Sequence, residues 1–311
     1  MTFACVFPGQ GSQSLGMLSA LSDAHPQVRE AFEEASDALG SDLWNLAQNG
    51  PEEDLNRTEM TQPAMLAAGV AAWRVWQASG GRTPAILAGH SLGEYTALVC
   101  AGALAFGNTV QLVAERGRLM QGAVAPGEGA MAAILGLDDG QVMDICARAA
   151  QGGVVEAVNF NSPGQVVIAG DTAAVDRAVA LAAEVGARRS VKLPVSVPSH
   201  CRLMEDAAAR LADRLADTAV TAPGIPVIHN VDASAHDAPD DIRAALAAQL
   251  HRPVRWVDSV RHMAAQGVSA IVELGPGRVL TGLNKRIDKG LGVICVQDPE
   301  SLRQALDLVG A

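Results

Sequence analysis

Residues 89–95 read GHSLGEY and follow the apolar run PAILA of residues 84–88 directly, while residues 94–101, EYTALVCA, have helical character. A serine between two glycines suits neither a strand nor a helix interior. The stretch therefore predicts a strand, an abrupt turn that carries Ser91, and a helix. Gly-x-Ser-x-Gly in that setting is typical of a nucleophile elbow, in which a strained turn exposes the serine hydroxyl at the end of a sheet.

The same turn supplies a second feature of acyl-transfer sites. Its glycines let neighbouring backbone approach closely, and it directs the N–H of Leu92 and the positive end of the following helix toward the serine. An ordinary glycine-rich turn is the alternative interpretation of the five-residue pattern. The strand–turn–helix setting favours a nucleophilic Ser91.

A nucleophilic serine needs a base, and the chain has seven histidines. His200 is the strongest candidate, because it closes VSVPSH at residues 195–200, a loop between two predicted elements where positioned bases commonly lie. His229 and His251 remain candidates, whereas His90 is expected to point away from the adjacent serine and to be structural. No Asp or Glu stands out as the group that fixes the imidazole tautomer, but a backbone carbonyl or an amide can do this instead.

Short apolar stretches alternate with helix-like stretches along the chain, which predicts an α/β fold. Strands are expected at residues 3–7, 84–89, 225–229, 269–274 and 293–296. Helices are expected at residues 25–39, 62–78, 92–101 and 107–121, and from just after His200 to about residue 217.

The pattern changes at APGEG, residues 125–129. Strands are then expected at residues 131–137, 154–159, 165–169 and 188–193, with helices at 138–151 and 171–186. The order βαββαβ is that of a ferredoxin-like unit. We therefore expect an α/β-hydrolase-like catalytic core with a parallel-strand sheet at residues 1–124 and 198–311, and an inserted ferredoxin-like subdomain at residues 125–197.

Composition excludes several classes of protein. The net charge of −11 argues against a general nucleic-acid binder. Five widely spaced cysteines without a C-x-x-C pattern indicate neither a disulfide framework nor a zinc site, and fit buried thiols in a reducing compartment. The N-terminus lacks a signal-peptide pattern, and the longest apolar stretch, residues 64–73, is too short to cross a membrane. We expect a cytoplasmic protein that binds no metal, no nucleic acid and no membrane.

Further motifs lie before and after the serine turn. GQGSQ at residues 9–13, GHSLGE at 89–94 and PSH at 198–200 together resemble the malonyl-CoA:acyl-carrier-protein transacylases of bacterial fatty-acid synthesis. TQPA, ERG, VNFNSPGQ and ELGPG are also similar to that family and occur in family order, at residues 61–64, 115–117, 158–165 and 273–277. The resemblance runs from residue 3 to about residue 287, and is far more specific than one Gly-x-Ser-x-Gly.

The resemblance implies a catalytic role for each of five positions. Ser91 is expected to be the acylated nucleophile and His200 its general base. The histidine of this family is oriented by a backbone carbonyl, which corresponds here to that of Gln249. The oxyanion is expected to bind the backbone N–H groups of Leu92 and Gln10.

Arg116 matches the arginine that pairs with the free carboxylate of the malonyl group, which its guanidinium can bind through two hydrogen bonds. The alternative is a surface arginine paired with Glu115 or Glu128.

The resemblance also implies substrate-binding roles for three amide side chains. Gln62 matches a polar residue that lines the acyl pocket, and Asn159 and Asn161 flank a strand and turn in the subdomain. The alternatives are a helix-start role for Gln62 near Pro63, and a turn that the two asparagines stabilise.

The implied reaction transfers a malonyl group from malonyl-CoA to the phosphopantetheine thiol of acyl carrier protein, through a malonyl-serine intermediate. The sequence shows no long exposed apolar stripe, which favours a monomer. Exchange between a thioester and an oxyester requires neither a metal nor a redox cofactor. Three alternatives remain: an acyltransferase that supplies a polyketide synthase, a serine thioesterase or esterase, and a non-catalytic interaction protein.

The acidic character of the chain poses a problem, because CoA and acyl carrier protein are also acidic. Attraction must then come from a local basic patch. The candidates are Arg188, Arg189 and Lys192, or Lys285 with Arg286; the alternative is that these are ordinary solvated surface charges.

Overall fold

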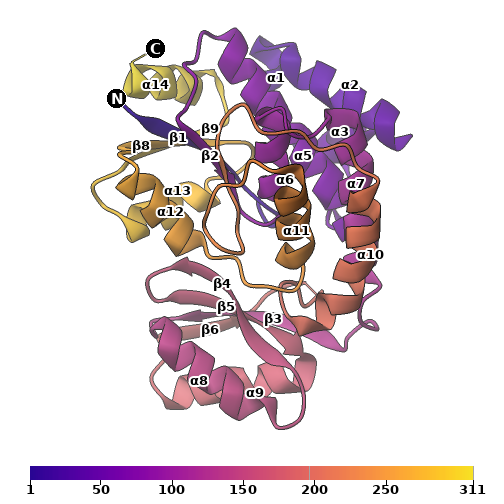
Figure 1. Cartoon of the computed structure of the whole chain (residues 1–311), viewed down its shortest axis with the longest axis vertical. Helices are drawn as coiled ribbons and strands as arrows, with labels where there is room; N and C mark the ends of the chain where they lie inside the picture. The colour runs from indigo at the N-terminus through magenta and orange to yellow at the C-terminus, as the bar shows by residue number, and fades with distance from the viewer. Residues whose placement is uncertain (196, 311) are drawn as a thin grey trace.

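The computed structural model describes residues 1–195 and 197–310, which form two sheets with helices packed against them (Figure 1). In Figure 1 the first sheet lies in the upper part of the molecule among most of the helices, and the second lies at the lower end beside two helices. The predicted α/β class, with a parallel sheet and a separate antiparallel sheet, is confirmed.

The larger sheet is five-stranded, and all its strand pairs are parallel. Its strands, in spatial order, are β7 (Val227–Ile228), β2 (Ile86–Gly89), β1 (Phe3–Phe7), β8 (Ala270–Leu274) and β9 (Gly292–Val296). Strands β1, β2 and β8 are buried at every position. Helices cover both faces of this sheet, which explains why these strands are nearly continuous apolar runs.

Alternate side chains of β1 point to opposite faces of the sheet, where they meet different helices. Phe3, Cys5 and Phe7 belong to one core cluster, and Ala4 and Val6 to another. The cluster on the first face also contains side chains from α1 (Ser19–Ala24), α2 (Gln27–Leu39), α3 (Leu43–Asn49), α4 (Glu52–Leu55), α5 (Thr58–Ala78), α6 (Leu92–Cys100), α7 (Phe106–Gln121), α10 (Glu205–Ala216), α11 (Pro239–Gln249) and α14 (Pro299–Val309). The second is covered by α12 (Trp256–Ala265) and α13 (Val279–Ile287).

The smaller sheet is antiparallel and has the spatial order β4 (Val155–Ser162), β5 (Gln165–Asp171), β3 (Gly129–Leu135), β6 (Arg189–Lys192). With α8 (Asp139–Ala150) and α9 (Thr172–Glu184) it follows the predicted βαββαβ order and buries an apolar cluster of its own. The bounds of the predicted subdomain, residues 125–197, stay a prediction.

Backbone hydrogen bonds join the edge strand β4 of the smaller sheet to Val254, in the part of the chain that carries the larger sheet. Val254 follows α11, and its N–H donates to the carbonyl of Val158 at 2.8 Å, while the N–H of Phe160 donates to the carbonyl of Val254 at 3.0 Å. The edge strand β4 therefore gains a backbone partner from the part of the chain that carries the larger sheet, and its polar edge is covered.

Some elements differ from those expected. The helix after His200 begins as a 3-10 turn, η1 (Arg202–Met204), before α10. Strand β7 has two residues where the sequence predicts five, because it is an edge strand that pairs with β2 only at those two positions. The sequence did not predict α1, α3 and α4, which are too short to show a clear 3.6-residue periodicity, nor the longer α11–α14. Within the described ranges, no helix is both long and apolar enough to span a bilayer.

The turn between β2 and α6 brings backbone atoms into direct contact. A Cβ atom at Gly93 would lie 2.1 Å from the carbonyl oxygen of Phe7, and one at Gly89 would lie 1.9 Å from the carbonyl carbon of Gly93. No side chain fits at either position. Gly93 is therefore explained by packing of the first turn of α6 on the end of β1, and Gly89 by the close approach of that same turn to the end of β2.

We predict that Gly93→Ala lowers the free energy of unfolding by about 1–3 kcal/mol or prevents folding, since the backbone must move to admit the methyl group. Gly282→Ala is the matched control. Gly282 lies inside α13, where an added Cβ meets no atom within 4 Å. Its replacement should stabilise the protein by about 1 kcal/mol through helix propensity. Urea unfolding of both variants gives the two values, and equal stability would contradict the packing argument.

Candidate active site

Ser91 lies at the N-terminus of α6, in the strained backbone conformation that a nucleophile elbow requires. Its φ and ψ are 51° and −111°. Phe7 of β1 pairs with Gly89 of β2, so the two strands end level and their following loops lie at the same edge of the sheet. A Cβ atom at Gly9 would lie 2.4 Å from the carbonyl oxygen of His90, so the Gln10 loop packs directly on the serine turn.

Two backbone N–H groups were expected beside this serine. Leu92 is the first residue of α6, so its N–H has no partner inside the helix. Gln10 and Leu92 both line the same cavity as Ser91. The structure therefore brings together the residues from which an oxyanion site was predicted.

His200 contacts Ser91 and is held by the C-terminal end of α11. Its Nε2 lies 2.8 Å from Ser91 Oγ, and its Nδ1 lies 2.6 Å from the carbonyl oxygen of Gln249. Its backbone N–H donates to the next carbonyl, that of Leu250, at 2.9 Å. A carbonyl only accepts, so Nδ1 carries the proton and Nε2 presents a lone pair to the serine hydroxyl.

The environment of His200 favours the neutral imidazole. Burial and, after it, the charge of Arg116 lower its pKa to about 3, while the hydrogen bond to the Gln249 carbonyl opposes the shift. A neutral imidazole with a free Nε2 lone pair is the form that can remove a proton from Ser91.

Arg116 projects from α7 toward Ser91 and is only 1% exposed. Its Nη1 donates to Gln62 Oε1 at 2.8 Å, and its Nη2 donates to Gln249 Oε1 at 2.9 Å and to Ser91 Oγ at 3.3 Å. The guanidinium also lies over the ring of Tyr95, 5.4 Å from its centroid.

The alternative interpretation, a surface arginine paired with Glu115 or Glu128, is wrong. Glu115 pairs with Arg214 instead, at 3.3 Å. Arg116 lies on the side of α7 that faces the interior, one residue further along the helix.

A cavity of about 480 Å³ opens beside Ser91, His200 and Arg116. Its other walls come from both parts of the molecule, and include Gln10, Leu92, Met120, Met131, Asn159 and Leu193. Met131 and Asn159 belong to the antiparallel sheet, whereas Gln10 and Leu92 follow strands of the parallel sheet. The reacting groups therefore lie where the two parts meet.

The remaining predicted residues lie around this centre. Gln62 is fully buried in α5 and contacts Arg116. Asn161 Oδ1 accepts a hydrogen bond from Nε2 of His90 at 2.8 Å, so it supports a histidine that the sequence predicted to be structural. Neither alternative base lines this cavity: His229 is buried with its Nδ1 2.8 Å from Glu94 Oε1, and His251 lies in the turn that follows α11.

Two polar residues at the site were missed by the sequence analysis. Asn230 Oδ1 accepts from the N–H of Ser91 at 2.7 Å, and its Nδ2 donates to the carbonyl of Gly89 at 2.7 Å. Glu94 is fully buried and accepts from the N–H of Asn230 at 2.9 Å. The position of Asn230 directly after a strand was the available signal, because polar residues at the carboxyl ends of neighbouring parallel strands converge.

Residues 1–195 and 197–310 contain no group of three or more His, Cys, Asp or Glu side chains arranged to hold a metal ion.

Comparisons with known proteins match this arrangement to a family. Residues 4–290 match the family described as acyl transferase domain. The chain is 56% identical, over 306 residues, to the malonyl CoA-acyl carrier protein transacylase of Escherichia coli strain K12, which covers 98% of this chain and 99% of that protein.

Solved structures agree with the sequence match. An acyl carrier protein S-malonyltransferase from Vibrio cholerae is 57% identical with a TM-score of 0.96, covering 98% of this chain and 100% of that one. A malonyl-transacylase solved in complex with a type II PKS acyl-carrier protein is 54% identical with a TM-score of 0.98, covering 99% and 100%. The chain therefore belongs to the acyl transferase family, as the resemblance of its motifs predicted.

Proposed function

We propose that the chain transfers a malonyl group from malonyl-CoA to the phosphopantetheine thiol of acyl carrier protein, for fatty-acid synthesis. The observation that carries this proposal is the meeting of Ser91 Oγ, His200 Nε2 and the Arg116 guanidinium at one cavity. The full-length similarity to proteins named malonyl transacylases supports it.

In the first half-reaction, His200 Nε2 takes the proton of Ser91 Oγ as that oxygen attacks the thioester carbonyl of malonyl-CoA. The backbone N–H groups of Gln10 and Leu92 stabilise the negative carbonyl oxygen of the tetrahedral intermediate. As the intermediate collapses, the C–S bond breaks and the CoA sulfur leaves with the proton from His200. The product is a malonyl ester of Ser91 and free CoA.

The second half-reaction runs the same steps in reverse order with a different thiol. His200 takes the proton of the phosphopantetheine thiol as its sulfur attacks the ester carbonyl. The C–O bond to Ser91 then breaks, and the serine oxygen recovers the proton from His200. Each step conserves oxidation state, so the reaction calls for no redox cofactor.

Arg116 binds the free carboxylate of the malonyl group throughout. Two amide oxygens and the Ser91 hydroxyl are its neighbours, so its positive charge is available to an anionic substrate. A buried guanidinium that has no carboxylate partner favours the binding of malonyl over neutral acyl groups, because a neutral acyl group leaves the positive charge of the guanidinium unpaired.

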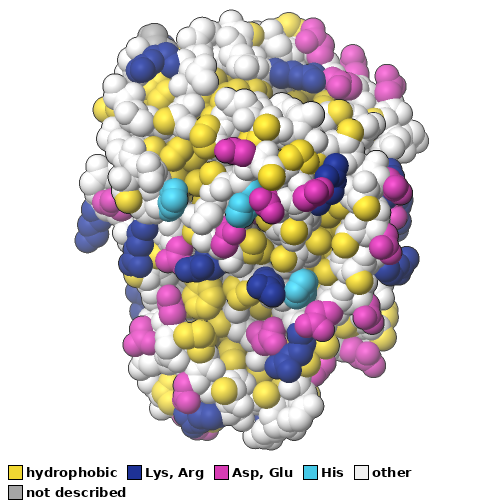
Figure 2. Space-filling view, in the orientation of Figure 1, with side chains coloured by type: hydrophobic (Ala, Val, Ile, Leu, Met, Phe, Trp, Pro, Cys, Tyr) yellow, Lys and Arg dark blue, Asp and Glu magenta, His cyan; other side chains and the backbone are white. Residues whose placement is uncertain are grey.

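We also propose that the enzyme is a cytoplasmic monomer that docks acyl carrier protein through a local basic patch. On the face seen in Figure 2, Lys and Arg side chains are interspersed with Asp and Glu side chains. Lys192 pairs with Asp176 at 2.7 Å, whereas Lys285 and Arg286 are exposed in the last turn of α13. Arg188 and Arg189 are exposed as well, so both clusters are candidates for the patch.

A carrier protein of polyketide synthesis is the second candidate partner. The similarity to a transacylase solved with a type II PKS acyl-carrier protein favours it. The chemistry at Ser91 is the same for both carriers, and competition between the two carrier proteins for the malonyl-enzyme distinguishes them. Release of free malonate as fast as transfer would instead favour a thioesterase.

We predict that Ser91→Ala abolishes the mass gain of one malonyl group that intact-mass spectrometry should detect after incubation with malonyl-CoA. Ser199→Ala is the matched control, since it removes a serine hydroxyl near His200 in the same loop and should leave the adduct in place. A full adduct on the Ser91→Ala variant would remove this serine from the mechanism.

We predict that Arg116→Met lowers malonyl transfer by roughly 10- to 100-fold relative to acetyl transfer, the effect expected for lost hydrogen bonds to a charged group. Methionine nearly fills the space of the arginine stem without its charge. Arg214→Met, which removes an exposed arginine paired with Glu115, is the control and should change neither rate. Equal loss of both activities at Arg116 would mean that this arginine is structural.

We predict that acylation of Ser91 by acetyl-CoA stays fast well below pH 6. The lowered pKa of His200 means that the neutral, basic form of the imidazole persists as the pH falls, and is lost only as the pH approaches this pKa of about 3. Acetyl-CoA serves here because its acyl group carries no titrating carboxyl. Quenched-flow rates between pH 4.5 and 8 test this, and an acid limb with its midpoint near the ordinary histidine pKa of about 6.5 would contradict it.

A further inference from the structure

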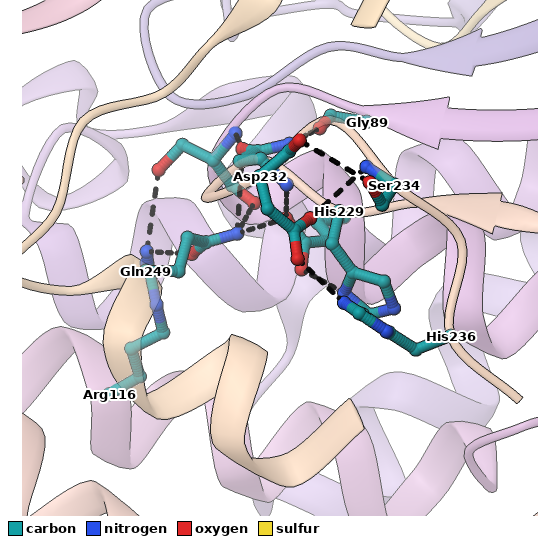
Figure 3. Close-up of polar contacts among 10 residues, drawn as sticks. Gly89, Arg116, His229, Asp232, Ser234, His236 and Gln249 are labelled. Carbon is teal, nitrogen blue, oxygen red and sulfur yellow. Dashed lines mark hydrogen bonds and ion pairs between the residues drawn. The ribbon is translucent and has the colours of Figure 1, made fainter. Parts of the chain in front are cut away.

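The side chain of Gln249 connects Arg116 to a buried carboxylate. Gln249 Oε1 accepts from Arg116 Nη2 at 2.9 Å, and Gln249 Nε2 donates to Glu94 Oε2 at 2.7 Å and to the carbonyl of Ser91 at 3.0 Å. Both Gln249 and Glu94 are fully buried. In Figure 3, Arg116 and His229 lie on opposite sides of Gln249. These contacts are separate from the backbone carbonyl through which Gln249 orients His200.

Hydrogen-bond direction leaves one orientation for this amide. Glu94 Oε2 also accepts from the backbone N–H of Asn230 at 2.9 Å, and a backbone N–H can only donate. Oε2 is therefore an acceptor, so Gln249 must present its NH₂ group there. The carbonyl oxygen of the amide then faces the opposite way, toward a guanidinium that can only donate.

Glu94 thus acts on Arg116 through one intervening residue. If the amide of Gln249 were reversed, its NH₂ group would face the donors of Arg116, and the guanidinium would lose one of its two amide partners. Gln62 would then be the only amide that accepts from Arg116, through Nη1. The Nη2 end, which lies 3.3 Å from Ser91 Oγ and so next to the reacting acyl group, is the end that would be released.

We propose that the side chain of Gln249, oriented by Glu94, positions Arg116 for the acyl carboxylate, and that both are specificity-determining positioning residues. The inference rests on the proposed malonyl transfer. The proposed malonyl transfer uses only the backbone carbonyl of Gln249, for which the side chain would be dispensable. The inference adds a role for that side chain.

The ratio of malonyl to acetyl transfer isolates this role. Gln249→Leu keeps the backbone carbonyl that holds His200 and removes the amide that faces Arg116. It also removes the donor to the Ser91 carbonyl, but that loss affects both acyl groups alike. We expect the malonyl-to-acetyl ratio of kcat/KM to fall about 10-fold or more, as for a lost hydrogen bond to a charged group.

Asn284→Leu is the matched control for the loss of a buried amide. Asn284 is fully buried and accepts from Trp256 Nε1 at 2.9 Å, away from the cavity. Its replacement should lower the melting temperature and leave the malonyl-to-acetyl ratio unchanged. If the malonyl-to-acetyl ratio also falls in Asn284→Leu, the fall in Gln249→Leu would be a consequence of lowered stability.

A second pair of variants tests Glu94. Glu94→Gln keeps an oxygen that can accept from Asn230 and from Gln249, so the orientation of the amide and the malonyl-to-acetyl ratio should be largely retained. Glu94→Leu removes that acceptor, and the ratio should fall as it does in Gln249→Leu. If Glu94→Leu does not fold, Gln249→Leu with its control decides alone.

The outcomes separate the inference from the function on which it rests. A wild-type protein that forms no malonyl adduct overturns the proposed function. A wild-type protein that does form it, together with a folded Gln249→Leu variant of unchanged malonyl-to-acetyl ratio, overturns the inference and leaves the function standing.

Discussion

The site depends on a close backbone contact between the first turn of α6 and the ends of two strands. Gly93 packs on the carbonyl of Phe7, and Gly9 packs on the carbonyl of His90, with no side chain between them. These contacts place the loop after β1 against the turn after β2, and so bring Gln10 and Leu92 to the same side of Ser91. Larger side chains at the two glycines would separate the groups that the proposed chemistry needs together.

Two helix ends of opposite polarity meet at the reacting atoms. Ser91 caps the N-terminus of α6, and the backbone N–H and the imidazole of His200 bind the last carbonyls of α11. The proposed transition state develops negative charge on the substrate oxygen and positive charge on the imidazole. The partial charges of these two helix ends match that separation, because N-termini favour anions and C-termini favour cations.

Much of this arrangement could be predicted from local patterns. Gly-x-Ser-x-Gly after an apolar run predicts the turn and its exposed serine, because only glycine tolerates such packing. The βαββαβ order between Gly129 and Lys192 could be predicted because most of its elements are long enough to show their period. The residues that hold Arg116 could not be found in this way. Gln62, Gln249 and Glu94 come from α5, α11 and α6, and only the tertiary packing of these helices brings their side chains into contact. Asn230 and Glu94 were missed because a buried amide or carboxylate has no local signature that separates it from a surface one.

The bridge between Val254 and strand β4 has a consequence for how acyl selectivity can change. It fastens the antiparallel sheet to the segment directly after α11, the helix whose end holds His200. One side of the cavity is then lined by Met131, Asn159 and Leu193, and the other by the nucleophile Ser91 and its base His200. Substitutions on the first side can enlarge or narrow the room for an acyl tail without disturbing the bond-making groups, so substrate size and reactivity are free to diverge independently during evolution.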